Sequence, residues 1–219
     1  MVSNFVGQKD RKGEKAWTSD QITEIIIVSN IDTKNLNVLL FFFNFSFWGT
    51  EKYVLKDFHQ KQFPDSVVRT EVGFMSPEEN AVENPSYRQV CTGETGHVEV
   101  LDVELKDPDK TFEELIRFFF MFHDPTTKNR QGNDVGTQYA SAIFCSDEQQ
   151  IEIATRVKEE LQAAVDKGKV KYQKSKVETF IAPYTKFYPA EEDHQQYLMK
   201  NPLGYCNHRF RFTSWPEVN

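Results

Sequence analysis

The segment HVEVLDVEL, from His97 to Leu105, limits the possible folds more than any other part of the chain. Its polar and apolar side chains alternate almost perfectly, which is typical of a half-buried strand. The longest apolar run, Val38 to Trp48, is interrupted by Asn44 and falls short of the ~20 residues that cross a bilayer, so it predicts a buried strand. The fold must therefore contain a sheet with a covered face.

Helical periodicity takes over between the predicted strands. The stretch GTEKYVLKDFH has apolar side chains at helical spacing. Capping-box patterns, Thr111 with Glu114 and Ser146 with Gln149, predict the starts of two longer helices. Further strands are predicted in DSVVRTEVGFM, TQYASAIFC and KVETFIAP, and a short last helix in AEEDHQQYLMK. This mixed order favours an α+β two-layer sandwich, and we predict the ferredoxin-like split β-α-β plait.

Length and composition predict one folded domain with irregular ends. Of the 219 residues, we expect 1–35 to be disordered or foreign to the fold, 36–206 to form the domain, and 207–219 to lie along its surface as a tail. A net charge of -7 makes nucleic acid and acidic membranes poor partners, so a small or peptide substrate is expected. We also predict a monomer.

Cysteine usage and the N-terminus predict a cytoplasmic protein. The three cysteines show no CxxC or paired Cys/His spacing, which argues against a disulfide framework and a zinc site. No secretory signal pattern opens the chain. We predict neither a metal nor a cofactor.

Four separate segments carry residues suited to chemistry. Phe47 to Gly49 (FWG) stands at a strand-to-helix turn, where free N–H groups suit an anionic nucleophile or an oxyanion. The alternative interpretation is two core aromatic residues beside a turn glycine. Glu99 shares the predicted core face of its strand with apolar residues, where desolvation favours the protonated acid and a role as proton donor. A buried ion pair is its alternative.

The other two segments are a loop and a tail. The polar loop from His123 to Tyr139 is long enough to be functional, although a plain surface loop explains it equally well. Cys206 follows a flexible Gly-Tyr pair, so its thiol could reach a partner sulfur. An incidental cysteine is the alternative.

Taken together, the segments from Phe47 to about Cys206 resemble a known family. FWGTE, NPSYRQVCTGETGHVEV, FFFMFHDPTTKNRQGNDVGTQYASAIF, KFYPAEEDHQQYL and NPLGYC are similar, in this order, to the A-type peptide methionine sulfoxide reductases. The resemblance implies an oxidoreductase that reduces methionine-S-sulfoxide, free or in proteins, as protein repair in oxidative stress. It also implies the α+β plait and thioredoxin as the reductant.

The resemblance assigns roles by position. It implies that Phe47 and Trp48 form the pocket for the substrate methyl group, and that Tyr87, Glu99 and Tyr139 hold the sulfoxide oxygen while Glu99 donates a proton.

Further roles concern the loop and the cysteines. By the same resemblance, Asp134 organises the supporting loop, Cys206 is the recycling cysteine, and Cys91 and Cys145 are structural.

The catalytic position departs from the family pattern. Where the family has Gly-Cys-Phe-Trp-Gly, this chain has Phe45-Ser46-Phe47-Trp48-Gly49. A serine hydroxyl is far less acidic than a thiol and has no histidine placed to activate it. Nor can an oxygen form a disulfide with Cys206. We therefore predict that the chain as written does not turn over.

Three explanations for Ser46 are open. An engineered Cys-to-Ser change is disfavoured because Asn44 and Phe45 also depart from the small residues expected there. A natural pseudoenzyme would bind sulfoxides without reducing them. The third is a gene-model error, which we favour because the resemblance ends abruptly at Phe47 and LLFFFNFS is what a pyrimidine-rich tract ending in AG would encode.

Overall fold

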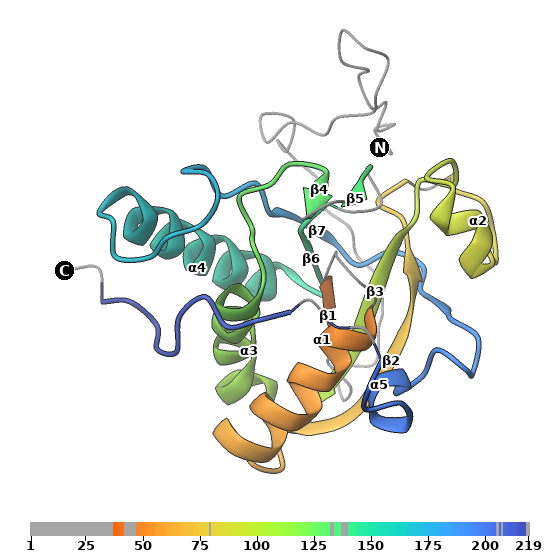
Figure 1. Ribbon diagram of the computed structural model, residues 1–219, viewed down its shortest axis with the longest axis horizontal. Coiled ribbons are helices and arrows are strands. Elements are labelled where there is room, and N and C mark those ends of the chain that lie inside the picture. The colour runs from red at the N-terminus through yellow and green to blue at the C-terminus, as the bar shows by residue number, and fades with distance from the viewer. Residues whose placement is uncertain are drawn as a thin grey trace, which may run out of the picture. The chain divides into compact units, whose positions relative to one another are not determined.

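The computed structural model contains a six-stranded sheet in the order β7-β6-β1-β3-β2-β8. It describes residues 47–78, 80–131, 134–136, 140–204, 206 and 208–217, with only the backbone of 37–41, 131, 134 and 135. The inner strands are β1 (Asn37–Phe41), β2 (Val67–Met75), β3 (Val98–Leu105) and β6 (Ala142–Cys145), and the pairings among these four strands are all antiparallel. This order is that of the split β-α-β plait, so the predicted α+β sandwich is confirmed (Figure 1).

Two further strands extend the plait at its edges. β7 (Phe180–Pro183) runs parallel to β6, and β8 (Tyr188–Pro189) pairs antiparallel with β2. A separate two-stranded ribbon joins β4 (Arg130–Gln131) to β5 (Asp134–Val135).

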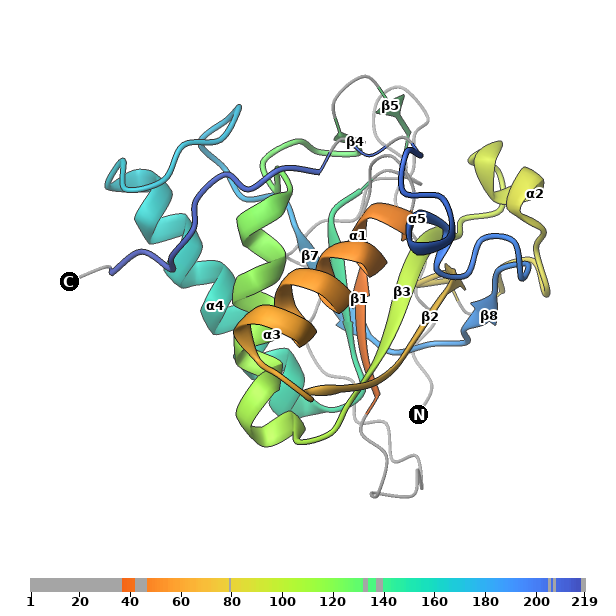
Figure 2. The ribbon, with the colours of Figure 1, turned by 60° about the horizontal axis from the view of Figure 1, so that its bottom comes forward.

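Helices cover one face of the sheet (Figure 2). α1 (Phe47–Tyr53) continues directly into the π-helical segment η2 (Val54–Gln62) between β1 and β2. α3 (Pro108–Phe122) connects β3 to β6, and α4 (Glu148–Asp166) connects β6 to β7. No helix among these described residues is long and apolar enough to cross a membrane. The largest fully buried side chains are phenylalanines from both layers: Phe47, Phe58, Phe74, Phe118, Phe119, Phe120, Phe122 and Phe144.

Strand β3 is buried on both faces, whereas its alternation predicted burial of one. Leu101, Val103 and Leu105 join the main core under the helices. Val98 and Val100 belong to a second cluster on the opposite face, together with side chains of β2 and β6. Partly buried side chains from the β7–β8 region pack against this second cluster, so the far face is covered too.

Both long helices begin at residues other than the predicted caps. α3 starts at Pro108 after Asp107, and Thr111 lies in its first turn, where its hydroxyl donates to the Asp107 carbonyl at 2.7 Å. Proline suits the first helical position because its missing N–H would be unpaired there anyway. α4 is capped by Asp147, whose carboxylate accepts from the Gln150 N–H at 2.8 Å. The predicted capping boxes at Thr111 and Ser146 were therefore wrong.

A capping box does occur, at a helix that was not predicted. α2 (Tyr87–Cys91) begins after Ser86, whose hydroxyl accepts from the Gln89 N–H, while the Gln89 side chain accepts from the Ser86 N–H at 2.9 Å. The last helix, α5 (Tyr197–Lys200), is much shorter than the predicted segment.

The C-terminal segment, residues 208–217, packs along the helical layer. The Arg211 N–H donates to the Met121 carbonyl at the end of α3, at 2.7 Å. The Trp215 ring lies 6.5 Å from the Phe120 ring, and the Phe212 ring lies 6.3 Å from that of Tyr172. Residues 36–219 form one compact unit that includes this segment.

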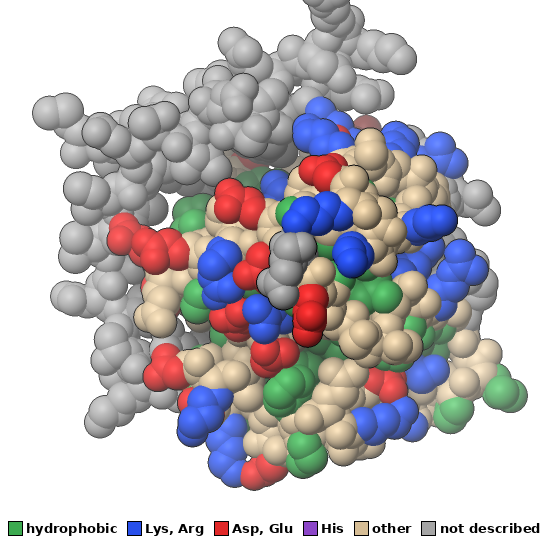
Figure 3. All heavy atoms as spheres, turned by 90° about the vertical axis from the view of Figure 1, so that its left-hand side faces the viewer, with side chains coloured by type: hydrophobic (Ala, Val, Ile, Leu, Met, Phe, Trp, Pro, Cys, Tyr) green, Lys and Arg blue, Asp and Glu red, His purple; other side chains and the backbone are tan. Residues whose placement is uncertain are grey.

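Basic and acidic side chains intermingle on the face of the molecule shown in Figure 3. Between α3 and α4, Arg156 pairs with Glu113 at 2.6 Å and with Glu160 at 2.8 Å. Lys and Arg side chains gather toward the upper right of this view, whereas side chains of both signs alternate over the left and lower parts of the face.

Candidate functional site

The start of α1 lies against an acidic side chain of the sheet. Phe47 is the first residue of α1 and fully buried, and its backbone N–H donates to Glu99 Oε2 on β3 at 3.2 Å. Glu99 is only 9% exposed, on the face of β3 that the alternation predicted. The first N–H groups of a helix lack partners within the helix, so the carboxylate satisfies one of them. The carboxyl group is thereby placed at the N-terminus of α1.

Five aromatic rings form a cluster beside this carboxyl group, which we call the aromatic cluster. Phe47 and Tyr87 have ring centroids 6.2 Å apart, and Tyr87 lies 4.5 Å from His194. Trp48 stacks on His194 at 5.6 Å and on Tyr197 at 3.7 Å. Trp48, Tyr87, His194 and Tyr197 are partly exposed, so the cluster reaches the surface.

His194 and Tyr197 were not predicted as site residues. His194 lies in the turn that leads into α5, and Tyr197 is the first residue of that helix, far from Trp48 in the chain. Two signals were available in the sequence: the aromatic residues of AEEDHQQYLMK, which are equally typical of a core, and the resemblance of KFYPAEEDHQQYL to the family, which assigned these two residues no role.

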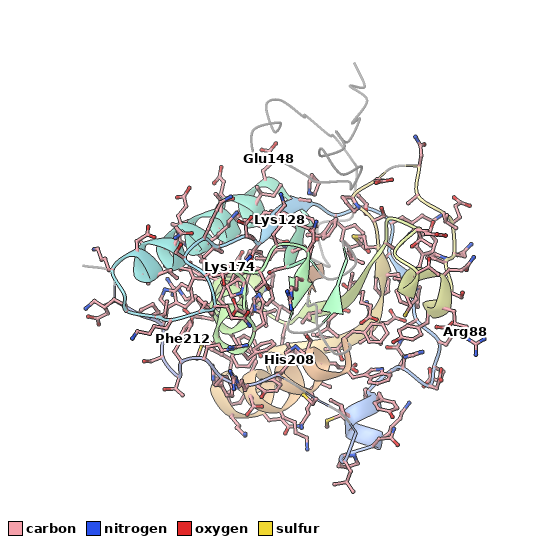
Figure 4. All side chains as sticks on the ribbon, turned by 45° about the horizontal axis from the view of Figure 1, so that its top comes forward. Arg88, Lys128, Glu148, Lys174, His208 and Phe212 are labelled. Atoms are coloured by element: carbon pink, nitrogen blue, oxygen red, sulfur yellow. The ribbon has the colours of Figure 1, made fainter. Side chains whose placement is uncertain are left out.

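Cys206 lies against the first turn of α1. A Cβ atom added at Gly49 would lie 3.2 Å from Cys206 Sγ and 2.1 Å from His208 Nδ1. The Cys206 sulfur is 3.9 Å from the same imidazole nitrogen. Figure 4 labels His208, whose carbonyl accepts from the Tyr53 hydroxyl at 2.8 Å. Burial, with a smaller contribution from Arg211, lowers the pKa of His208 to about 4, so the ring is neutral at pH 7.

The other two cysteines lie in contrasting environments. Cys145 ends β6 in the core, where burial raises the pKa of its thiol and leaves it inert. This agrees with its interpretation as structural. Cys91 instead is exposed at the end of α2, so its thiol is no part of the core.

Three predicted site residues fall wholly or partly outside the described residues. Ser46 and Tyr139 lie outside them. Asp134 begins β5, and only its backbone is described. Among the side chains that the structure describes, no group of three or more His, Cys, Asp or Glu could hold a metal ion.

The arrangement suits a small substrate with an apolar end and an acceptor oxygen. Aromatic faces provide the apolar surface, and the Glu99 carboxyl group is the nearby acid. The Cys206 thiol lies over the same helical turn. An apolar wall, an acid and a thiol therefore meet at the first turn of α1.

Comparison with known proteins agrees with this arrangement. Residues 40–215 match the family model described as peptide methionine sulfoxide reductase. A probable peptide methionine sulfoxide reductase of Schizosaccharomyces pombe is 41% identical over 165 residues, which cover 75% of this chain and 90% of the relative.

Two solved structures share the fold. Mxr1 from Saccharomyces cerevisiae in its reduced form is 38% identical with a TM-score of 0.68, and the match covers 84% of this chain and 96% of that one. Methionine sulfoxide reductase A of Corynebacterium diphtheriae is 35% identical with a TM-score of 0.65, covering 80% of this chain and 79% of the other.

Proposed function

Because this chain belongs to the peptide methionine sulfoxide reductase family of oxidoreductases, we propose that its aromatic cluster and Glu99 bind methionine-S-sulfoxide, free or in proteins. The observation that carries this proposal is the hydrogen bond from the Phe47 N–H to Glu99. It brings an acid and the apolar Phe47–Trp48 pair to the same turn, next to the position at which the family places its nucleophile.

Each side chain has a distinct task in this proposal. Phe47 and Trp48 hold the methyl group of the sulfoxide, while Tyr87, Glu99 and Tyr139 hold its oxygen. The buried Glu99 is the proton donor, because desolvation favours a neutral acid. Asp134 supports the loop that carries Tyr139.

Reduction needs a thiol at position 46. A thiolate there would attack the sulfoxide sulfur, and the oxygen, protonated by Glu99, would pass to the attacking sulfur to give methionine and a sulfenic acid. Cys206 would then attack the sulfenic sulfur, releasing water and forming a disulfide that thioredoxin reduces. Ser46 cannot begin this sequence, since its hydroxyl is too weakly acidic to lose its proton and an oxygen forms no disulfide. We propose that the chain as written binds the sulfoxide without reducing it.

The sequence of the mature transcript distinguishes two explanations of Ser46, the gene-model error and the natural pseudoenzyme. If the mature transcript across the codons for Met1 to Gly49 is spliced so that a cysteine codon precedes Phe47, the protein made in the cell is a reductase. A continuous serine codon would leave the second candidate function, a sulfoxide-binding protein without turnover. The cytoplasmic location and the monomeric state stay predictions in either case.

The experiment that tests the proposal is done on two forms of the chain. Titration of N-acetyl-methionine-S-sulfoxide amide into the serine form should show saturable binding, with the R epimer as the control. The Ser46→Cys variant should reduce the S epimer with dithiothreitol. Absence of binding in the first, together with absence of turnover in the second, would refute the proposal.

The role of Cys206 is tested separately. In the Ser46→Cys background, Cys206→Ser should abolish thioredoxin-dependent turnover and retain turnover with dithiothreitol. Equal turnover with both reductants would contradict a recycling role.

A further inference from the structure

A buried carboxylate in α1 takes no part in the proposed chemistry. Glu51 is 1% exposed. Its Oε1 accepts from the Thr70 hydroxyl on β2 at 2.9 Å, and its Oε2 accepts from the backbone N–H of Gln196 at 2.7 Å. Both oxygens are thus engaged by groups from other elements.

Burial of a carboxylate is unfavourable unless hydrogen bonds compensate it. Burial raises the pKa of Glu51, whereas the bonds from Thr70 and Gln196 act in the opposite direction. A leucine or alanine could fill the same helical position without this penalty. The carboxylate is therefore better explained by what it holds than by the packing of α1.

What Glu51 holds is the turn that carries two rings of the aromatic cluster. Gln196 has a φ of 52°, a left-handed conformation that is unfavourable for a non-glycine residue and needs support from its surroundings. His194 precedes it and Tyr197 follows it, and both rings stack on Trp48.

The same turn has a second attachment, to the sheet. The Gln195 side chain accepts from the Val72 N–H and donates to the Val72 carbonyl, both at 2.8 Å, and it donates to the Ala190 carbonyl at 3.0 Å. β2 therefore fixes the turn on one side, and Glu51 is its attachment to α1. Figure 2 shows α5 lying beside α1.

We propose that Glu51 is a positioning residue that holds the His194–Tyr197 turn so that its rings close the outer wall of the sulfoxide site against Trp48. This inference rests on the proposed function for the identity of the ligand. The attachment of the turn to α1 can be tested without it.

The test compares three substitutions in the full chain. Glu51→Met keeps the length of the side chain and leaves the Gln196 N–H without its acceptor. Glu51→Gln keeps an oxygen for Gln196 and can donate to the Thr70 hydroxyl. Thr70→Val is the matched control, because it removes the other hydrogen bond of the same carboxylate.

Two measurements are made on each variant. The first is the near-ultraviolet circular dichroism that Trp48→Phe removes, which reports the stacking of Trp48. The second is the affinity for N-acetyl-methionine-S-sulfoxide amide. Glu51→Met should lose the Trp48 signal and bind about five- to ten-fold more weakly, as expected for the loss of one anchoring hydrogen bond. Glu51→Gln and Thr70→Val should keep both.

The outcomes separate the two proposals. If Glu51→Met keeps the Trp48 signal and the affinity, or if Thr70→Val loses them equally, the positioning role is refuted. If the unsubstituted chain binds no sulfoxide, the proposed function fails, and the dichroism alone decides the role of Glu51. Should Glu51→Met fail to fold, Glu51→Asp, whose carboxylate is too short to reach both partners, takes its place with the same expectation.

Discussion

Gly49 presents bare backbone at the point of α1 that faces Cys206 and His208. The His208 ring is held in place because Tyr53 and Phe122 pack against it at 5.8 and 5.4 Å. A side chain at position 49 would occupy the space of the imidazole. At the scale of single residues, the absence of a Cβ atom therefore decides how closely Cys206 approaches the site.

We expect Gly49→Ala to displace this contact. Alanine favours a helix by about 1 kcal/mol over glycine, but its Cβ atom would lie 2.1 Å from His208 Nδ1. The net effect should be a loss of roughly 1–2 kcal/mol of stability, with several-fold faster reaction of Cys206 with a disulfide reagent. A Cys91→Ser background removes the exposed thiol. Lys56→Ala, at an exposed position that continues the same helix, is the control. An unchanged rate in Gly49→Ala would contradict the contact.

Asp102 on β3 is the second residue with a testable electrostatic consequence. It is 2% exposed and pairs with Arg69 at 2.8 Å, and burial raises its pKa to about 6 despite that pairing. A carboxyl whose pKa is higher in the folded state than in the unfolded state destabilises the fold once it ionises. Stability from this group is therefore lost as the pH rises from about 4 to about 6.

Asp102→Asn should remove this loss. The amide is isosteric with the protonated acid, and its oxygen can still accept from Arg69. We expect the variant to gain about 1–3 kcal/mol relative to the unsubstituted chain at pH 7, and much less at pH 4. Chemical denaturation of both forms at the two pH values measures this difference. A gain that is equal at both pH values would show that ionisation of Asp102 is not its cause.

At the scale of elements, the C-terminal segment behaves as part of the helical layer. The Trp215 Nε1–H donates to Glu160 on α4 at 3.2 Å, and the Arg117 guanidinium lies 5.8 Å from the Trp215 ring centroid. Trp215 thus bridges α3 and α4. Farther up the chain, Leu203 is fully exposed and makes no comparable packing contact.

Truncation of these two side chains should therefore have unequal effects. Trp215→Ala removes a half-buried ring with a hydrogen bond and a cation–π contact, so we expect a loss of about 1–3 kcal/mol. Leu203→Ala should change stability by less than about 0.5 kcal/mol. Thermal unfolding of the two variants measures the contrast. If Trp215→Ala lowered stability no more than Leu203→Ala does, the C-terminal segment would not stabilise the helical layer.

At the scale of the whole molecule, buried histidines make the fold sensitive to acid. His123, at the end of α3, forms hydrogen bonds with the Phe119 carbonyl through Nδ1 at 2.9 Å and with the Ser141 hydroxyl through Nε2 at 3.0 Å. Burial lowers the pKa of His123 to about 3. Burial also lowers the pKa values of His97 and His208. A base whose pKa is depressed in the folded state contributes stability above its unfolded pKa, and this stability is lost as the pH falls.

We expect the free energy of unfolding to fall by about 2–5 kcal/mol through His123 alone as the pH drops from 6.5 toward 3. Asp102 acts in the opposite direction over part of this range, so the test is a comparison. His123→Asn keeps a donor and an acceptor without a titrating group. It should be less stable at pH 7 but show a flatter dependence on pH in denaturant titrations. Identical slopes would rule out His123 as the source.

The amino-acid sequence by itself determined the local geometry of single elements. A period of two along His97–Leu105 is a property of a single strand, so it placed Glu99 on the core face before any contact was known. The succession of periods was enough for the α+β plait, because few ways exist to cover such a sheet. Motifs around Phe47 and Cys206 identified the family. The sequence alone also shows that Ser46 departs from the family's Gly-Cys-Phe-Trp-Gly pattern.

Contacts between distant segments were decided only by the tertiary structure. Nothing local distinguishes His194 or Tyr197 from core aromatic residues, and their stacking on Trp48 follows from the turn that Glu51 and Gln195 hold. The second buried face of β3 likewise depends on the β7–β8 region, which follows β6 in the chain and packs against that face. Periodicity reports the geometry of one element, whereas burial and pairing depend on which elements meet when the whole sheet is covered.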